Sequence, residues 1–297
     1  MITLEEISLD KKELINSFLT QKCTQNSEFT FTNLFMWRKS YDIRYAIIDG
    51  MFCVMPQHTG GPRSATFPLG TGNPKPVIEK LLVWFKERGE EPLIRLYNDE
   101  AVSELEEMFP GKFLITEDVG SFDYVYSTEE LIQLSGKKFH TKKNHVNKFK
   151  RLYDYEYQRL TLSDRAEVEE MYNRWYDNKE DIPGLTEERE AVMELLKNWG
   201  HLDITGACLR VDGKMAAFSF GEPLCCNMAV IHLEHADMEY EGSFAAMNQM
   251  FLENEWADFP YVNREEDMGL EGMRRAKLSY RPIFQVKKYV ATLNHTL

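Results

Sequence analysis

The order of predicted strands and helices in residues 204–293 restricts the fold of this chain more than any other feature. The segment "ITGACLRVDGKMAAFSFGEPL" contains two apolar runs joined by Asp212-Gly213, a residue pair typical of a β-hairpin turn. The segments "CNMAVIHLEHAD", "YVNREEDMG" and "QVKKYVATLN" have strand patterns. Between the first two, "GSFAAMNQMFLENEWA" places Phe244, Met247 and Phe251 at helical spacing. Hairpin, strand, helix, strand, short helix and strand predict an α/β (α+β) sheet domain.

The first half of the chain carries a less regular version of the same order. Residues 42–55, "DIRYAIIDGMFCVM", are two apolar runs joined by Asp49-Gly50, and the segments "VIEKLLVWFKERG" and "EPLIRLYN" predict a helix and a strand. This order of elements is typical of acyltransferase-type α/β domains. We therefore predict two such domains, residues 1–135 and 154–297, joined by residues 136–153.

Charge and composition limit the classes of function. The net charge of the 297 residues is −13, which argues against general binding of nucleic acid or anionic membranes. No apolar run approaches the roughly 18 residues that span a bilayer. The five cysteines show no CxxC pair and no Cys/His zinc spacing. The start "MITLEEISLDKK" has acids where a signal peptide has bases, so we expect a cytoplasmic protein.

One segment departs from this acidity. "GKKFHTKKNHVNKFKRLY", residues 136–153, holds seven Lys or Arg and no acid. On a helix, Phe139, Val146, Phe149 and Tyr153 form one apolar stripe, and we expect the basic residues to point elsewhere. Two interpretations stay open, a solvated linker helix and a face that contacts phosphates. The polyanion-binding candidates are Lys137, Lys138, Lys142, Lys143, Lys148 and Arg151.

A second polar cluster lies around Gly269 and Gly272. Arg274 and Lys277 share a helix face there, so they suit a phosphate, a carboxylate or a tetrahedral oxyanion. A structural network of ion pairs on an exposed turn is the alternative. The candidate substrate-binding residues are Asn263, Arg264, Glu265, Gly269, Arg274 and Tyr280, and the candidate catalytic residues are Glu234, Asp267 and Lys277.

The segment "IHLEHAD" supplies Glu234. On a strand, His232 and Glu234 share one face while His235 points to the other, which is poor geometry for a metal chelate. We therefore predict no metal site. Glu234 is a candidate general base, with an ion pair to Arg264 or Arg274 as the alternative.

These motifs carry a family resemblance. "LSGKKFHTKKNHVNKF" and "VNREEDMGLEGMRRAKLSYRP" resemble a bacterial family grouped with the C-terminal domain of phosphatidylglycerol lysyltransferases, and "SEFTFTNLFMW" fits it as well. The resemblance implies two tandem GNAT-like domains joined by a basic helix, the layout of the Fem-type aminoacyl-tRNA-dependent transferases. "GLEGMRRAK" is similar to the Gly-rich segment with a following Lys in those enzymes. The lysyltransferases carry a large membrane domain that these 297 residues do not contain, which leaves the lipid acceptor open.

The stretch "EYEGSFA" bears on the donor. GNAT enzymes that bind coenzyme A carry R/Q-x-x-G-x-G/A there, and its backbone N–H groups hold the pyrophosphate. The negative charges of Glu239 and Glu241 would repel a pyrophosphate, and the Phe244 side chain would crowd it.

We therefore expect an aminoacyl or acyl transferase with an aminoacyl-tRNA-type donor, an amine or hydroxyl acceptor and no cofactor. The alternatives are a non-catalytic protein that binds tRNA, a nucleotide or a phospholipid headgroup, and an acyl-CoA N-acyltransferase. The acceptor is a small molecule or a lipid headgroup, and peripheral membrane contact stays open.

Overall fold

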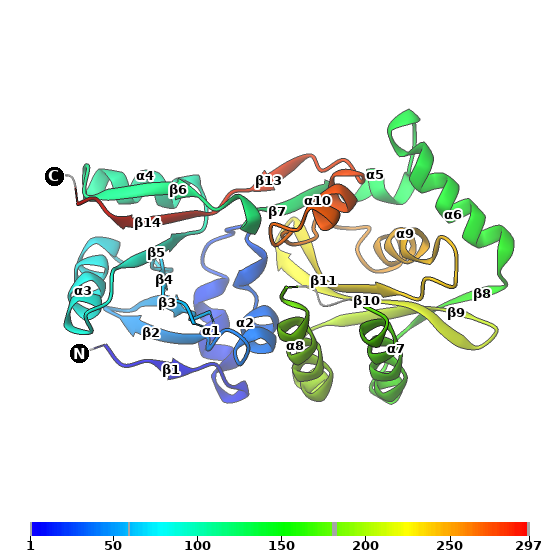
Figure 1. The fold of residues 1–297 in the computed structure, drawn as a ribbon, viewed down its shortest axis with the longest axis horizontal. Helices are drawn as coiled ribbons and strands as arrows, with labels where there is room; N and C mark the ends of the chain where they lie inside the picture. Colours follow the sequence, from blue (N-terminus) through cyan, green and yellow to red (C-terminus); the bar gives the residue numbers. More distant parts are fainter. Residues whose placement is uncertain (1, 59, 180–182, 296–297) are drawn as a thin grey trace. The chain divides into compact units, whose positions relative to one another are not determined.

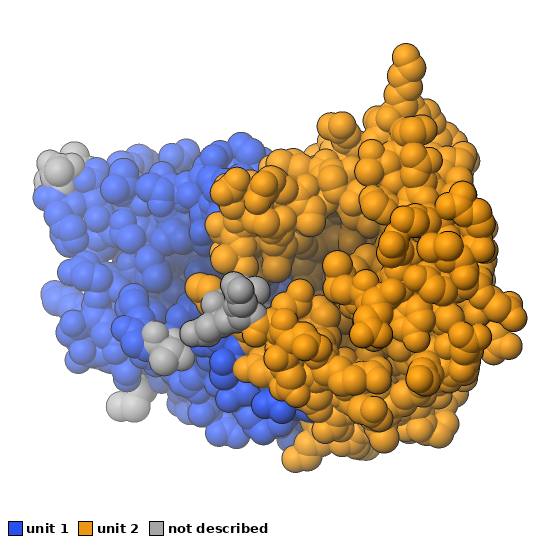
Figure 2. All heavy atoms as spheres, turned by 45° about the vertical axis from the view of Figure 1, so that its right-hand side comes forward, with its two compact units in different colours: residues 1–122, 186–194, 286–297 blue, residues 123–185, 195–285 orange. Residues whose placement is uncertain are grey.

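The computed structural model describes residues 2–58, 60–179 and 183–295. Its elements are labelled in Figure 1. Two compact units divide the chain, and Figure 2 shows them in different colours. The first unit comprises residues 1–122, 186–194 and 286–297, and the second comprises residues 123–185 and 195–285.

A mixed seven-stranded sheet forms the second unit, in the order β13-β7-β12-β11-β10-β9-β8. Strands β11 and β12 are parallel, whereas β8, β9, β10 and β11 form an antiparallel run. The strands are β7 Asp123–Ser127, β8 Tyr155–Arg159, β9 Thr205–Val211, β10 Lys214–Cys225, β11 Met228–Ala236, β12 Tyr261–Asn263 and β13 Phe284–Val286. The helices are α5 Thr128–Gln133, α6 His140–Leu152, α7 Arg165–Asp177, α9 Ser243–Glu255 and α10 Glu271–Leu278. Helix α8, Leu185–Asn198, contributes residues to both units.

Helix α9 is the centre of the apolar core of the second unit. Its Met247 and Phe251 are buried against strand residues such as Ala229 and Ile231, and α5 and α6 pack beside it. Helix α7 lies on the opposite face of the sheet, where His235 contacts Tyr172 (Figure 1). His235 therefore faces α7, whereas the register of β10 and β11 is irregular at His232, between Ile231 and Leu233, so the alternation of the two histidines stays a prediction.

The predicted basic helix is present. Helix α6 follows a 3-10 turn at Lys137–Phe139, and the stripe residues Phe139, Val146 and Phe149 are buried in the same core. Tyr153 is only partly buried, because the chain becomes extended there. The apolar stripe whose spacing predicted this helix also anchors the acid-free segment in the core.

The first unit contains two sheets. The three-stranded sheet has the order β1-β2-β3, and the four-stranded sheet has the order β4-β5-β14-β6. The strands are β1 Glu5–Glu6, β2 Arg44–Ile48, β3 Met51–Met55, β4 Ala65–Thr66, β5 Leu93–Leu96, β6 Phe113–Glu117 and β14 Tyr289–Leu293. The helices are α1 Lys12–Leu19, α2 Phe31–Trp37, α3 Pro74–Glu87 and α4 Asp99–Met108.

Both predicted hairpin turns are confirmed. Asp49 and Gly50 have positive φ angles of 51° and 78°, and Asp212 and Gly213 have 49° and 76°. Two successive positive φ values define the turn that matches the twist of paired strands, and glycine adopts them without steric cost.

The end of the chain differs from its predicted single strand. Phe284–Val286 joins the sheet of the second unit, whereas Tyr289–Leu293 pairs with β5 and β6 of the first. The compact units also differ from the predicted division at residues 135 and 154. Strand β7 pairs with β12, and α6 packs on α9, so both belong to the second unit. These pairings join residues far apart in sequence, which local patterns do not report.

Candidate functional site

Arg264 is the centre of the polar cluster in the second unit. It follows strand β12, whose parallel pairing with β11 brings it to Glu234 as predicted. One guanidinium nitrogen, Nη2, donates to Glu234 Oε1 at 2.7 Å, and Asn248 Nδ2 on α9 donates to Glu234 Oε2 at 2.9 Å. Both carboxylate oxygens of Glu234 therefore accept hydrogen bonds. Glu234 holds Arg264 in place, which is the ion pair given above as the alternative to a general base.

The other terminal nitrogen of Arg264, Nη1, lacks a hydrogen-bond partner among the described residues. Nη1 is buried and makes no hydrogen bond within the part of the chain that the structure describes. The guanidinium carbon lies 4.5 Å from the centre of the Tyr280 ring and 5.6 Å from that of Tyr126. Burial opposes the charge of Arg264, but the nearby Glu234 keeps its pKa above the ordinary value. The site thus holds a permanent cation with one unused donor.

Lys142 of α6 belongs to the same cluster. Its Nζ lies 3.8 Å from the centre of the Tyr280 ring. Burial, followed by the charge of Arg264, lowers the pKa of Lys142 to about 8. The expectation that Lys142 points away from the apolar stripe is wrong. It lies three residues after Phe139 and four before Val146, which is the helical spacing of a shared face.

Lys277 holds the turn after β12. Its Nζ donates to the backbone oxygen of Arg264 and, at 3.2 Å, to that of Glu265. Glu265 has a positive φ of 57°, a conformation that a glutamate adopts only when its surroundings impose it. Burial, with the charge of Arg264, lowers the pKa of Lys277 to about 8. These bonds give Lys277 a positioning role.

Asp267 and Arg274 form a separate pair. Arg274 Nε and Nη2 donate to the two Asp267 oxygens at 2.6 and 3.2 Å, Tyr124 donates at 2.6 Å and the Gly269 N–H at 2.8 Å. Burial opposes ionisation of Asp267, but these donors keep its pKa below the ordinary range. The pair fixes the start of α10 to β7. Gly269 and Gly272 both face open space.

Two further buried groups support the turn. Asn263 is fully buried, donates to Asp123 at 2.9 Å and accepts the Glu265 N–H at 2.7 Å. His232 lies between Glu222 and Glu265, with 2.8 Å on each side. Burial opposes its charge, but the two carboxylates raise the pKa of His232 to about 10, so it is an imidazolium at neutral pH. Across the described residues, no group of three or more His, Cys, Asp or Glu is placed to hold a metal ion.

The predicted site residues therefore fall into two groups. Arg264, Glu234, Lys277 and Tyr280 gather at the turn after β12, whereas Asp267, Arg274 and Gly269 belong to the separate pair beside it. The structure adds members to both. Asn248, Glu222 and the two rings of Tyr124 and Tyr126 come from elements remote in sequence, and no sequence signal marked them.

The basic face of α6 is smaller than predicted. Lys138 is paired with Glu130 at 2.6 Å, and Lys148 is paired with Glu241. Lys137, Lys143 and Arg151 are exposed and form no ion pair within the described residues. Among the predicted polyanion-binding candidates, these three are the ones that a polyanion can reach without breaking an ion pair of the described residues.

We expect this difference to appear in the salt dependence of tRNA binding. Lys143→Ala should lower the slope of log affinity against log salt by about one, because one phosphate contact is lost. Lys148→Ala should change the slope less, since its charge already faces Glu241. Electrophoretic shifts of bulk tRNA at increasing salt concentrations measure the slope for each variant. Equal slopes for the wild type and Lys143→Ala would support the alternative interpretation of α6 as a solvated linker.

Helix α6 also covers the N-terminus of α9. The Gly242 backbone approaches α6 so closely that a Cβ there would overlap the His145 carbonyl oxygen and lie 3.2 Å from Phe149 Cβ. The Glu241 N–H is taken by the Tyr153 hydroxyl at 3.0 Å. This helix end is where the coenzyme A pattern places pyrophosphate.

We therefore predict that acetyl-CoA binds poorly. Protein atoms of α6 occupy the approach to the α9 N-terminus. Glu239 adds negative charge beside it, whereas the charge of Glu241 is paired with Lys148. Titration calorimetry should show no saturable binding at the micromolar concentrations typical of substrates. A dissociation constant near one micromolar would contradict this prediction.

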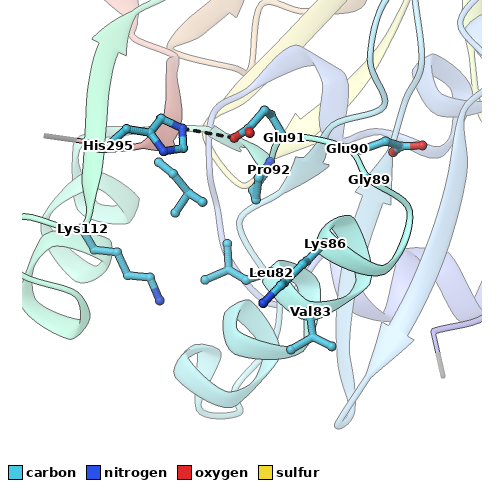
Figure 3. Close-up of a pocket in the computed structure, with 10 residues that line it drawn as sticks. Leu82, Val83, Lys86, Gly89, Glu90, Glu91, Pro92, Lys112 and His295 are labelled. Atoms are coloured by element: carbon cyan, nitrogen blue, oxygen red, sulfur yellow. Dashed lines mark ion pairs between the residues drawn. The ribbon is translucent and has the colours of Figure 1, made fainter. Parts of the chain in front are cut away.

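A hollow in the first unit is lined by none of the residues of this network. It has a volume of about 420 Å³, and Leu293 is among the residues that line it. Figure 3 shows Leu82 and Pro92 in its lining. His295 and Glu91 pair at 3.3 Å on its rim. None of the residues singled out from the sequence lines it.

The fold and the site define a class of protein. A tandem GNAT protein from the clavulanic acid biosynthesis pathway matches 100% of this chain and 99% of its own, with a TM-score of 0.51 and 7% identity. The chain is thus a GNAT-like α/β protein, as predicted. The model of the family "Phosphatidylglycerol lysyltransferase, C-terminal" matches residues 21–292, so the chain belongs to that family.

Three relatives are informative. A conserved protein of unknown function from Bacteroides thetaiotaomicron is 34% identical, with a TM-score of 0.93, and the match covers 99% of this chain and all of that one. L-PGS from Bacillus licheniformis is 14% identical, with a TM-score of 0.67 and coverages of 99% and 94%. An uncharacterized protein of Mycoplasmoides gallisepticum is 27% identical over 178 residues; the match spans 57% of this chain and only 56% of that protein's length.

Proposed function

We propose that this chain is an aminoacyl transferase that moves an aminoacyl group from an aminoacyl-tRNA-type donor onto an amine or hydroxyl acceptor. Membership of the phosphatidylglycerol lysyltransferase C-terminal family over residues 21–292 is the observation that carries this proposal. The α6 helix over the α9 N-terminus disfavours coenzyme A as the carrier. The exposed basic residues of α6 favour a carrier with phosphates.

The proposed transfer needs one bond exchange. The acceptor nitrogen or oxygen attacks the ester carbonyl carbon of the donor, and the bond from that carbon to the terminal ribose oxygen breaks. The acceptor loses one proton and the ribose hydroxyl gains one, so the products are an amide or ester and a deacylated tRNA. In this scheme Arg264 contacts a substrate, while Glu234, Asp267 and Lys277 keep the turn and α10 in position.

The cationic character of the cluster suits this reaction. Negative charge develops on the carbonyl oxygen during attack, and fixed donors in a dry site stabilise such charge strongly. Arg264 supplies a fixed donor that is 14% exposed, and Lys142 supplies a second cation beside it.

Transfer to hydroxylamine tests the proposal without knowledge of the natural acceptor. The full chain is mixed with a pool of labelled aminoacyl-tRNA and hydroxylamine, and the aminoacyl hydroxamate is measured over a single turnover. We expect formation well above the uncatalysed rate, and no acetyl hydroxamate from acetyl-CoA. Tight binding of aminoacyl-tRNA with no acceleration would instead indicate the non-catalytic alternative.

Two finer points belong to this proposal. Among the described residues no helix is long and apolar enough to cross a membrane. The cytoplasmic location and the small-molecule or lipid-headgroup acceptor stay predictions from the sequence. The position of the Arg264 network in residues 123–185 and 195–285 supports catalysis in the second unit.

A further inference from the structure

We propose that Arg264 and Lys142 form an oxyanion-binding subsite in the second unit, which takes a phosphate or carboxylate group of a substrate. The inference rests on the proposed function only for the identity of the molecule that carries the anion. The subsite itself is a property of residues on α6, β11, the turn after β12 and the segment after α10.

The unused donor of Arg264 is the first observation. An arginine presents five N–H groups in a planar fork, and a buried one is normally satisfied on both sides. Here Nη2 reaches Glu234, but Nη1 is buried with no acceptor among the described residues. A bound oxyanion would supply that acceptor.

The charge balance is the second observation. Glu234 is the carboxylate that contacts Arg264, and its second oxygen is taken by Asn248. Lys142 contributes another cation, which lies over the Tyr280 ring and makes no ion pair within the described residues. Two cations therefore share one carboxylate in a partly buried place. Buried charges are costly unless they are paired, so this excess favours an anionic ligand.

The supporting structure keeps Lys142 in place. The Gly242 contact seats α6 on α9, and Phe139, Val146 and Phe149 bury the face that also carries Lys142. Tyr280 is buried and lies beneath both cations, at 3.8 Å from Lys142 Nζ and 4.5 Å from Arg264 Cζ. Because both cations contact the same buried ring, they stay close to one another, and an oxyanion beside the ring can reach both.

Direct anion binding tests this subsite with two probes, sulfate for a phosphate-like group and acetate for a carboxylate. Calorimetry on the full chain should show saturable binding of at least one of them. Tighter binding of sulfate would indicate a phosphate source, and tighter binding of acetate a carboxylate source. Lys142→Met should weaken binding about tenfold or more, and Lys142→Arg should retain it. Lys214→Met should leave it unchanged, because Lys214 is an exposed lysine at the start of β10 in the same unit.

The pH dependence gives an independent readout. Arg264, Glu234 and Tyr280 face Lys142, and the pKa of Lys142 is lowered to about 8. Its charge is present below that pH and is lost above it, whereas sulfate keeps its charge throughout. Wild-type affinity for sulfate should therefore fall up to about tenfold between pH 7 and 9, and Lys142→Arg should show a flat profile.

The outcomes separate this inference from the proposed function. Equal affinities for the wild type, Lys142→Met and Lys214→Met would overturn the subsite, as would the absence of saturable binding of either anion. Transfer to hydroxylamine would still support the proposed function in that case. Anion binding that follows Lys142 without any transfer would support the subsite and remove the proposed function.

Discussion

Gly242→Ala should destabilise the second unit by about 3 kcal/mol, more than most single substitutions. Gly242 has a positive φ of 86°, which costs an alanine about 1 kcal/mol. The new methyl group would also overlap the His145 carbonyl oxygen, and backbone atoms cannot turn aside as a flexible side chain can. Overpacking of that kind adds roughly 1–3 kcal/mol. Urea unfolding of the wild type and the variant measures the difference.

Gly213→Ala is the matched control. Gly213 has a φ of 76°, and no atom lies within 4 Å of the position that its Cβ would take. It therefore carries the backbone penalty without the clash, and we expect a loss of about 1 kcal/mol. Equal losses for the two variants would mean that α6 is not seated on the N-terminus of α9.

The second large effect concerns the Arg264–Glu234 pair. Arg264→Met should cost about 3–5 kcal/mol of stability, because it leaves the Glu234 carboxylate buried without its cation. The two side chains are 14% and 10% exposed, so solvent screens the pair little. Glu234→Gln in the same chain removes the orphaned charge and keeps an acceptor for Asn248. The double variant should therefore be more stable than Arg264→Met alone.

A double-mutant cycle distinguishes the coupling between Arg264 and Glu234 from a general loss of stability. Arg210 forms an ion pair with Asp164 in the same unit, with both side chains 13% exposed. Arg210→Met combined with Glu234→Gln should give additive losses, because the two sites share no partner. Additive losses for Arg264→Met with Glu234→Gln would contradict the pairing.

Local patterns predicted the elements that position the site. The Asp212-Gly213 turn, the apolar stripe of α6 and the adjacency of Glu234 and Arg264 all follow from spacing or from the expected order of strands. In each case the signal is a short repeat or a turn whose geometry depends on neighbouring residues.

The remaining features depend on long-range packing. Asn248 meets Glu234 only because α9 crosses β11, and His232 meets Glu222 only through the register of β10 and β11. The return of Tyr289–Leu293 to the first unit is likewise a pairing between distant segments. Lys142 is different, since its spacing from Phe139 already placed it on the stripe. The charge of Lys142 suggested an exposed position, although its spacing from Phe139 indicated the buried face.

A crystal structure of the full chain with an amide-linked analogue of an aminoacylated tRNA 3′ end tests the role of Arg264 and Lys142 most directly. We expect the analogue to lie in the second unit, with one of its oxygens within hydrogen-bond distance of Arg264 Nη1 and Lys142 Nζ. An analogue bound elsewhere, with Arg264 and Lys142 unchanged and out of contact, would contradict it.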